Sequence, residues 1–369
     1  MGFLKIMQRC LDKHMRYKLL GKTGLRVSEL CLGGMTFGQD WGTMLAGASK
    51  EESKKIFEHF VKAGGNFIDT ANVYQNGSSE KYIGEFIALE REKFVLSTKY
   101  TLSTNPDDPN ASGSHRKNLV QSVEASLKRL NTSYIDLLWV HFWDFMTPVE
   151  ELMRSLDDIV RSGKVLYVGI SDAPAWIISK ANTMAELRGW SPFVGIQIMY
   201  SLIERTSERE LMPMAKALDI GVTAWSPLGG GILSGKYQTN NREPKRFDPN
   251  NPVSAMFVNE RNLSIANEVQ IIAKETGRSP SQVALNWIRH QKDKGVIIPI
   301  IGARTEAQIK DNMGCLDFEL TADQLKRLDE KSRISLGFPH DLIARAAKTF
   351  AYGNVFSLID YHREDYTER

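Results

Sequence analysis

The stretch FIDTANVYQNGSSEKYIG, residues 67 to 84, passes from a short apolar run through a polar turn into a segment typical of a helix. The apolar run ends on Asp69, and Tyr74 follows five positions later, before the helical segment. A strand, a loop and a helix in this order form the unit from which α/β proteins are built. The stretch therefore predicts one such unit, with a carboxylate and a phenol at the end of its strand.

The same pattern recurs along the chain. Besides residues 67–69, apolar or β-branched runs occupy residues 28–33, 93–99, 135–141, 165–171, 193–198, 221–226 and 295–301. The segments between them carry helix signals: residues 49–65 end on glycine, residues 115–131 repeat apolar side chains at helical spacing, and residues 279–291 open with Ser279 and Pro280. Eight runs that alternate with helices predict a parallel sheet closed on itself, a (β/α)8 TIM barrel.

Composition narrows the class of protein. The chain has 369 residues, 42% hydrophobic and 25% charged, with a net charge of +3. A small, scattered excess of basic residues disfavours a nucleic-acid partner. Three widely spaced cysteines predict neither a disulfide framework nor a thiolate metal site, and favour a reducing, cytoplasmic location. No segment has the apolar length of a signal peptide or membrane span, so no membrane partner is expected.

Residues without a large apolar side chain stand at or beside the ends of most of the apolar runs. They are Asp69, Lys99, His141, Ser171, Gln197, Ser226 and Gly302. In a TIM barrel the carboxyl ends of the strands converge on one mouth, where active sites lie. Any one of these residues alone could be a strand-end or capping residue. Together they predict a functional site at the mouth.

Several motifs, taken in order, resemble the aldo-keto reductase superfamily. They are FIDTANVYQNGSSEKYIG, FVLSTK, WVHFWD, GISDAPAW, QIMYS, WSPLGGGILSGKY and IPIIGARTEAQIKDN. The resemblance implies a TIM barrel that binds NADPH without a Rossmann fold, and the chain has no GxGxxG motif. It also implies that residues 17–30 form a short hairpin below the barrel. We therefore expect a leader at residues 1–15, the barrel at 16–336 and a long C-terminal extension at 337–369.

Carried over residue by residue, the resemblance implies a catalytic set of Asp69, Tyr74, Lys99 and His141. Reduction of a carbonyl leaves an alkoxide oxygen that needs a proton, which Tyr74 would supply. A phenol has an ordinary pKa of about 10, and the ammonium of Lys99 is expected to lower it, with Asp69 holding Lys99 in place. His141, neutral near pH 7, would orient the carbonyl.

The cofactor contacts are also implied by the resemblance. Ser171, Asp172 and Gln197 would bind the carboxamide and Tyr200 would stack on the nicotinamide. Ser226, Leu228, Gly230 and Lys236 would follow the pyrophosphate, and Gly302, Arg304, Gln308 and Asn312 the adenosine end. Asp172 departs from the asparagine of many members, and a carboxylate can only accept hydrogen bonds. Arg304 suits a ribose 2′-phosphate and favours NADPH over NADH.

Substrate and partner predictions are less specific. Trp41, Phe142 and Trp143 would line an aromatic pocket for apolar or aromatic aldehydes and ketones. Residues 237–257, rich in Pro and Asn, are expected to form a lid. The extension is expected either to pack over the barrel or to join two subunits of a homo-oligomer.

Two other functions remain open. Potassium-channel β-subunits share the implied fold and act through partners, so an NADPH-binding regulatory or redox-sensing subunit is the alternative to an enzyme. Gly230, Gly235 and Lys236 also have the spacing of a phosphate-binding P-loop. Tyr237, however, stands where that motif needs Ser or Thr for magnesium, which disfavours a nucleotide triphosphatase. No metal site is predicted.

Overall fold

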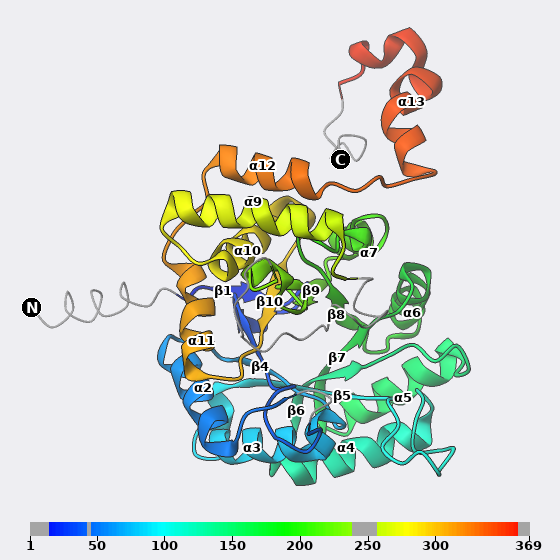
Figure 1. Ribbon diagram of the computed structural model, residues 1–369. Helices are drawn as coiled ribbons and strands as arrows, with labels where there is room; N and C mark the ends of the chain where they lie inside the picture. The colour runs from blue at the N-terminus through cyan, green and yellow to red at the C-terminus, as the bar shows by residue number, and fades with distance from the viewer. Residues whose placement is uncertain (1–14, 43–45, 238–256, 361–369) are drawn as a thin grey trace, which may run out of the picture.

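A closed barrel of eight parallel strands forms the centre of the computed structural model, which describes residues 15–42, 46–237 and 257–360 (Figure 1). The strands pair in the order β10-β3-β4-β5-β6-β7-β8-β9. They are β3 (Cys31–Gly33), β4 (Phe67–Asp69), β5 (Val95–Tyr100), β6 (Ile135–Val140), β7 (Val165–Ser171), β8 (Phe193–Met199), β9 (Gly221–Trp225) and β10 (Ile297–Ile301). The predicted TIM barrel is confirmed.

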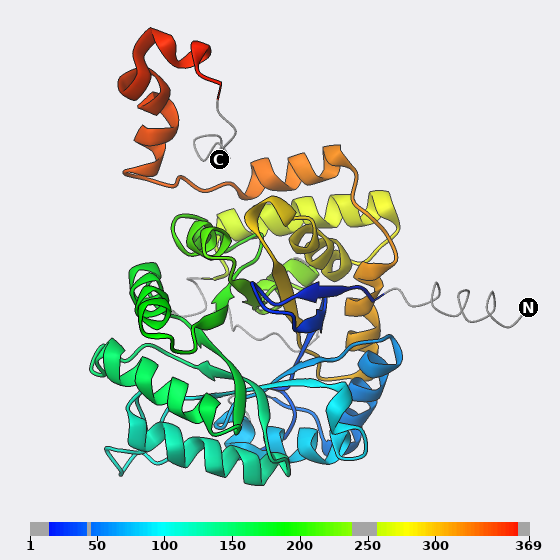
Figure 2. The same ribbon diagram turned by 180° about the vertical axis from the view of Figure 1, so that it is seen from behind.

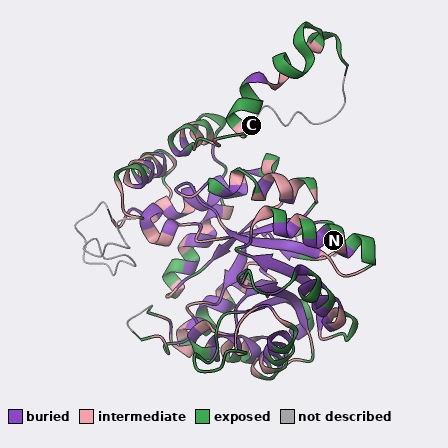
Figure 3. Cartoon of the chain, turned by 90° about the vertical axis from the view of Figure 1, so that its right-hand side faces the viewer, coloured by how far each residue is buried: buried purple, intermediate pink, exposed green. Residues whose placement is uncertain are grey.

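Helices cover the outside of the barrel. They are α2 (Lys50–Lys62), α3 (Ser78–Ile87), α4 (Arg116–Leu130), α5 (Val149–Arg161), α6 (Ala175–Arg188), α7 (Leu211–Ala217), α9 (Glu260–Thr276), α10 (Pro280–Arg289), α11 (Glu306–Met313) and α12 (Ala322–Ser332). Short 3-10 turns are η1 (Tyr74–Gly77), η2 (Arg91–Lys93), η3 (Thr206–Glu208), η4 (Gly229–Ser234), η5 (Lys292–Lys294) and η6 (Gly314–Leu316). The strands are buried and the helices expose their outer faces (Figure 3).

The predicted start and stop signals explain several of these helices. The side chains of Ser49, His115 and Ser279 each accept a hydrogen bond from the backbone of the first helical turn, in α2, α4 and α10 respectively. These bonds satisfy amide groups that have no partner inside the helix. The α4 helix ends at Asn131, which adopts a left-handed backbone.

The first predicted strand, residues 28–33, is two strands in the structure. β1 (Tyr17–Leu19) pairs antiparallel with β2 (Arg26–Ser28), and β3 begins only at Cys31. The Ser28 hydroxyl donates to the Leu30 carbonyl at 2.7 Å, which turns the chain between β2 and β3. The expected N-terminal hairpin is therefore confirmed, and it takes Ser28, the first residue of the predicted run.

This hairpin lies against the amino-terminal end of the barrel, behind the view of Figure 1 and in front in Figure 2. Leu20 and Val27 are fully buried in one cluster with Phe67 and Trp139 of the barrel interior. Gly21 adopts φ +54°, and a Cβ there would lie 2.6 Å from the Asp219 carbonyl oxygen. Only glycine permits this close approach, so the bottom of the barrel is sealed and access is left to the carboxyl ends of the strands.

The C-terminal extension leaves the barrel after α12. It forms α13 (His340–Tyr352) and η7 (Gly353–Leu358), which stand apart from the barrel in both views (Figures 1 and 2). Packing over the barrel of the same chain is therefore not what the structure shows for this segment. Across the described ranges, no helix has the length and apolar character needed to cross a membrane.

Candidate active site

Alternation along the strands decides which side chains reach the barrel interior. Phe67 in β4 and Val95 in β5 belong to the inner cluster, whereas Ile68 and Leu96 belong to the core between sheet and helices. Because side chains alternate between the faces of a strand, residues two or four positions further along point to the same side. By this count Asp69 and Lys99 face inward. Leu137 and Trp139 of β6 are also inner residues, which places His141 on the same side at the mouth.

Lys99 is the centre of the site. Its fully buried ammonium donates to Asp69 Oδ2 at 2.5 Å, to the Thr70 carbonyl at 2.7 Å and to the Tyr74 hydroxyl at 3.1 Å. All three protons of the ammonium are therefore used. The second oxygen of Asp69 accepts from Ser97 Oγ at 2.7 Å and from Gln197 Nε2 at 3.1 Å. A buried charge pair is tolerated only when its remaining donors and acceptors are satisfied, as they are here.

The pKa of Tyr74 differs from the sequence expectation in its net direction. Burial raises the pKa of this phenol above its ordinary value, and Lys99 opposes that rise while Asp69 and Asp172 add to it. Lys99 thus acts in the expected sense, but burial outweighs it. The pKa of Lys99 itself is lowered by burial and raised by Asp69 and Tyr74, with a net rise. Tyr74 is therefore a neutral phenol next to a permanent cation.

His141 packs against Tyr74 with the two rings edge to face, 5.7 Å between centroids. Burial, and then the nearby Lys99 ammonium, hold the pKa of His141 well below its ordinary value. The imidazole is thus neutral at pH 7, as expected from the sequence. Its Nδ1 is buried without a hydrogen-bond partner among the described residues. Since an unpaired buried N–H is costly, we expect the proton on Nε2.

Trp41 closes one side of the site. The η1 turn places Gln75 and Asn76 in left-handed backbone, at φ +50° and +52°. The buried Gln75 side chain accepts from the Trp41 amide at 3.1 Å and donates to the Met35 carbonyl at 3.3 Å. The Trp41 ring consequently stands edge to face against Tyr74, 6.1 Å between centroids. Strained backbone of this kind persists where surrounding contacts enforce it, often at functional sites.

These groups open into a cavity of about 880 Å³ at the carboxyl ends of the strands. Tyr74 and His141 line the cavity, and so do Arg304 and Asn312. Its lining includes most of the residues proposed from the sequence: Trp41, Asp69, Tyr74, His141, Ser171, Asp172, Gln197, Ser226, Leu228, Gly230, Lys236, Gly302, Arg304, Gln308 and Asn312. A partly polar cavity of this size, lined also by a glycine turn, fits a dinucleotide.

Tyr200 is not part of this lining. It is fully buried, its hydroxyl donates to Glu208 at 2.7 Å, and its ring stacks on Trp287 at 5.5 Å. The expectation that Tyr200 stacks on a nicotinamide is therefore not supported by its position. Trp225, which sequence reasoning missed, lies on the cavity wall, and its Nε1 donates to Asp172 Oδ1 at 3.2 Å.

Two of the three predicted substrate-pocket aromatics also lie elsewhere. Trp143 is buried, and Phe142 is half exposed, and neither lines the cavity. Leu102, which was not predicted, does line it. Only Trp41 keeps its expected place, and the proposed lid at residues 237–257 lies, except for its first and last residues, outside the described part of the chain.

The glycine-rich turn follows β9 directly. Gly229, Gly230 and Gly231 all have positive φ, and the Gly230 amide donates to Ser226 Oγ at 3.2 Å. Such a turn lets backbone amides approach an anion more closely than a chain with side chains could. It forms a 3-10 turn and is not followed at once by a helix, unlike a P-loop.

The far end of the cavity is held by α11. The Arg304 amide donates to Gln308 Oε1 at 2.8 Å, and Asn312 Nδ2 donates to the Gly302 carbonyl at 3.1 Å. These bonds fix the loop between β10 and α11 in front of the strand ends. Asp311 also lines the cavity and accepts from Gln282 Nε2 at 3.0 Å.

Comparison with known proteins agrees with this geometry. Residues 29–333 match the family model described as the aldo/keto reductase family. Norsolorinic acid reductase of Aspergillus flavus is 36% identical over 88% of this chain and 83% of its own length. A norsolorinic acid reductase of Emericella nidulans is 38% identical, with 86% and 81% covered. An aryl-alcohol dehydrogenase of Pestalotiopsis microspora is 37% identical, with 89% and 85% covered.

Proposed function

This chain belongs to the aldo/keto reductase family, and on that premise we propose that it reduces aryl aldehydes or ketones to alcohols with NADPH, using Tyr74 as the proton donor. The observation that carries the proposal is the buried contact of Lys99 with both Asp69 and Tyr74 at the base of the cavity. The family makes the chain an oxidoreductase of the aldo-keto reductase type. Cofactor, direction and substrate are the proposed parts.

Proton transfer is the task of Tyr74. When bound, NADPH supplies a hydride to the carbonyl carbon. As the C–O double bond becomes single, Tyr74 gives its hydroxyl proton to the oxygen, and the phenolate left behind is stabilised by the Lys99 ammonium 3.1 Å away. Asp69 keeps that ammonium charged and in place. The same residues support alcohol oxidation when the phenolate acts as base.

His141 has a separate role in this proposal. A neutral imidazole with its proton on Nε2 can donate a hydrogen bond to the substrate oxygen without competing with Tyr74 for the proton. Its lowered pKa keeps it neutral during turnover. His141 therefore orients the carbonyl, and Tyr74 protonates it.

The fit to NADPH rests on the cavity lining. Ser171, Asp172 and Gln197 would take the carboxamide, and Trp225 offers the aromatic face that was expected from Tyr200. The glycine turn would take the pyrophosphate. Arg304, at the other end, suits a 2′-phosphate through its fork of donors.

Aryl substrates are suggested by two observations. Trp41 and Leu102 both line the cavity, and the Trp41 ring packs against Tyr74. The related proteins are named for norsolorinic acid and for aryl alcohols. We therefore expect flat aromatic carbonyl compounds to be better substrates than short aliphatic aldehydes.

The test is steady-state NADPH oxidation with a panel of aryl aldehydes, aryl ketones, aliphatic aldehydes and dicarbonyls, repeated with NADH. The proposal predicts the highest kcat/KM for an aryl carbonyl with NADPH. Tight NADPH binding without turnover of any carbonyl would instead favour the regulatory or redox-sensing alternative.

A further inference from the structure

Exposed apolar side chains gather at two places on this protein. Eight of the twenty large apolar side chains that are exposed in the described part of the chain lie between residues 338 and 359. They include Ile343, Phe350 and Leu358. Soluble proteins rarely leave such a concentration uncovered unless it is an interaction site. The C-terminal extension is therefore a surface that requires a partner.

The helix α13 has two distinct faces. Ile343, Ala346, Ala347 and Phe350 recur at helical spacing and form an apolar stripe. Asp341, Arg345 and Lys348 follow the other side. Ala346 is buried, whereas Ile343 is 47% and Phe350 82% exposed, so the two ends of the apolar stripe are left uncovered by the described part of the chain.

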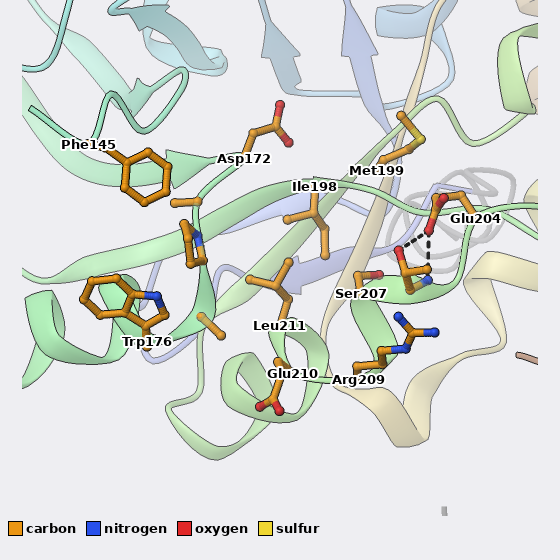
Figure 4. A pocket seen from close by; sticks show the side chains of 14 residues that line it. Phe145, Asp172, Trp176, Ile198, Met199, Glu204, Ser207, Arg209, Glu210 and Leu211 are labelled. Atoms are coloured by element: carbon orange, nitrogen blue, oxygen red, sulfur yellow. Dashed lines mark hydrogen bonds between the residues drawn. The ribbon is translucent and has the colours of Figure 1, made fainter. Parts of the chain in front are cut away.

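The second place is a groove of about 970 Å³ between α6 and the segment formed by η3 and α7, called here the α6–α7 groove. Figure 4 shows Phe145 and Trp176 on one side, Ile198 and Leu211 in the middle and Glu204 and Arg209 on the other. Phe145 is 71% and Trp176 63% exposed. The groove is thus an apolar slot with aromatic walls and a charged rim, of a kind that accepts an amphipathic helix.

The extension begins at the rim of this groove. The Arg209 guanidinium donates to the Ser335 carbonyl at 3.0 Å, and His340 Nε2 lies 2.9 Å from Glu210 Oε1. Asp341 at the start of α13 accepts from Ser335 Oγ at 2.8 Å and the Gly337 amide at 3.0 Å. These contacts direct α13 outward, away from the groove of its own chain (Figures 1 and 2).

We propose that the α6–α7 groove receives the α13 helix of a second copy of this chain, so that two copies exchange extensions. A two-fold axis makes this exchange reciprocal, since each chain offers one groove and one helix. If α13 turned back to cover the groove of its own chain, the contacts of Ser335 with Arg209 and of His340 with Glu210 would break. An exchange between two copies keeps both contacts. The polar side of α13, with Asp341, Arg345 and Lys348, lies opposite the apolar stripe, so a helix seated by that stripe keeps its charges at the rim, where the groove carries Glu204, Arg209 and Glu210.

The exchange would bring the partner close to the reaction centre. Asp172 lines both the α6–α7 groove and the catalytic cavity. The partner's helix would therefore form a wall beside that cavity, which the single chain leaves open.

The first test is sedimentation velocity of the full chain. Wild type is expected to be a dimer, and Phe350→Asp and Trp176→Glu are each expected to shift it to the monomer. Both positions are exposed, so neither change removes a core contact. Leu89→Asp, at a 98% exposed position after α3, is the matched control and should stay dimeric. A monomeric wild type, or a dimer that survives both changes, would overturn the proposal.

Cross-linking then identifies the occupant. One preparation of the protein carries Phe350→Cys and a second carries Trp176→Cys, both in a Cys10→Ser background. The two preparations are mixed and treated with a flexible bis-maleimide. Cys31 and Cys315 are buried and are left unchanged. Exchange predicts a cross-linked pair of the two different chains. A third preparation carries both cysteines on one chain. A cross-link that forms only within that chain would place the helix in its own groove, and no cross-link in any preparation would exclude the groove. Either result contradicts the exchange.

Discussion

The ammonium of Lys99 lies 3.1 Å from the hydroxyl oxygen of Tyr74, and its other two protons are taken by Asp69 and the Thr70 carbonyl. The phenol is buried, which raises its pKa, so its conjugate base depends on the Lys99 ammonium beside it. In the proposed reaction, this contact would let the proton of Tyr74 leave without stranding an unpaired negative charge.

Lys99→Met tests the contact from the side of the cation. Because it leaves the Asp69 carboxylate buried and unpaired, it is expected to cost about 3–5 kcal/mol in the free energy of unfolding. It should also lower kcat by about 100-fold or more. Adding Asp69→Asn should restore most of the stability but not kcat. Equal recovery of both quantities would contradict the assigned role of Lys99.

His141 predicts a specific pH dependence of stability. Its folded pKa lies below the ordinary value of about 6.5, so the unfolded chain binds the proton more readily. The stabilisation is complete above that value and is lost as pH falls toward the folded pKa, by up to about 1.4 kcal/mol per pH unit. Urea unfolding of wild type and His141→Gln at pH 7.5 and 5.5 measures this. The stability of wild type relative to the variant should fall at pH 5.5; a constant difference would argue against a buried neutral imidazole.

Arg304→Leu tests the choice of cofactor. Removing a charge-assisted contact with a 2′-phosphate, worth about 1.5–3 kcal/mol, should raise KM for NADPH by roughly 10- to 100-fold. Values for NADH should change by less than about twofold, since NADH has no such phosphate. Lys310→Leu removes the same charge from the neighbouring turn of α11, where Lys310 pairs with Glu306, and is the control. Equal losses for both cofactors would rule out the phosphate contact.

Asp172 is expected to hold Trp225 in place through the Nε1 bond of 3.2 Å. Asp172→Asn keeps an oxygen that can accept from Trp225, so the dissociation constant for NADPH should change by less than about threefold. Asp172→Leu removes both the acceptor of the Trp225 indole N–H and the proposed carboxamide contact, and binding should weaken by about tenfold. Fluorescence titration of both variants with NADPH is the measurement. Similar affinity in the two variants would mean that Asp172 does not position Trp225.

The repeating pattern of the sequence was sufficient to predict the barrel. Each of the eight runs became a strand, because alternating apolar runs and helices leave few other arrangements. The first run became a barrel strand only in its second half. Its first residue, Ser28, pairs with Tyr17 instead, and the Ser28 hydroxyl also accepts from the Phe67 amide, a contact with a residue far along the sequence.

Which aromatic residues face the cavity was harder to predict, although the alternation of side chains along the strands predicts it for Tyr200 and Trp225. Ile196, Ile198 and Tyr200 all belong to the core outside the barrel, which follows from the two-residue period of β8. In β9 the same count places Val222 and Ala224 outside and Trp225 inside. Trp143 could not be placed this way, because it lies in a loop whose path is set by packing.

The pKa of Tyr74 shows a different limit of sequence reasoning. The residues reveal that a lysine is near, but the degree of burial that outweighs it is a property of the folded chain. The outward direction of α13 could not be predicted from the sequence for the same reason. It depends on contacts of Arg209 and Glu210 with residues more than 120 positions later in the chain.

The most direct test of the central claim is the rate of NADPH oxidation with an aryl aldehyde by wild type and by Tyr74→Phe, with NADPH affinity measured on the same samples. The change removes one buried hydroxyl and keeps the ring that packs against Trp41 and His141. We predict unchanged cofactor binding and a kcat lowered by about 100-fold or more. A variant that binds NADPH equally well and turns over at the wild-type rate would show that Tyr74 is not the proton donor.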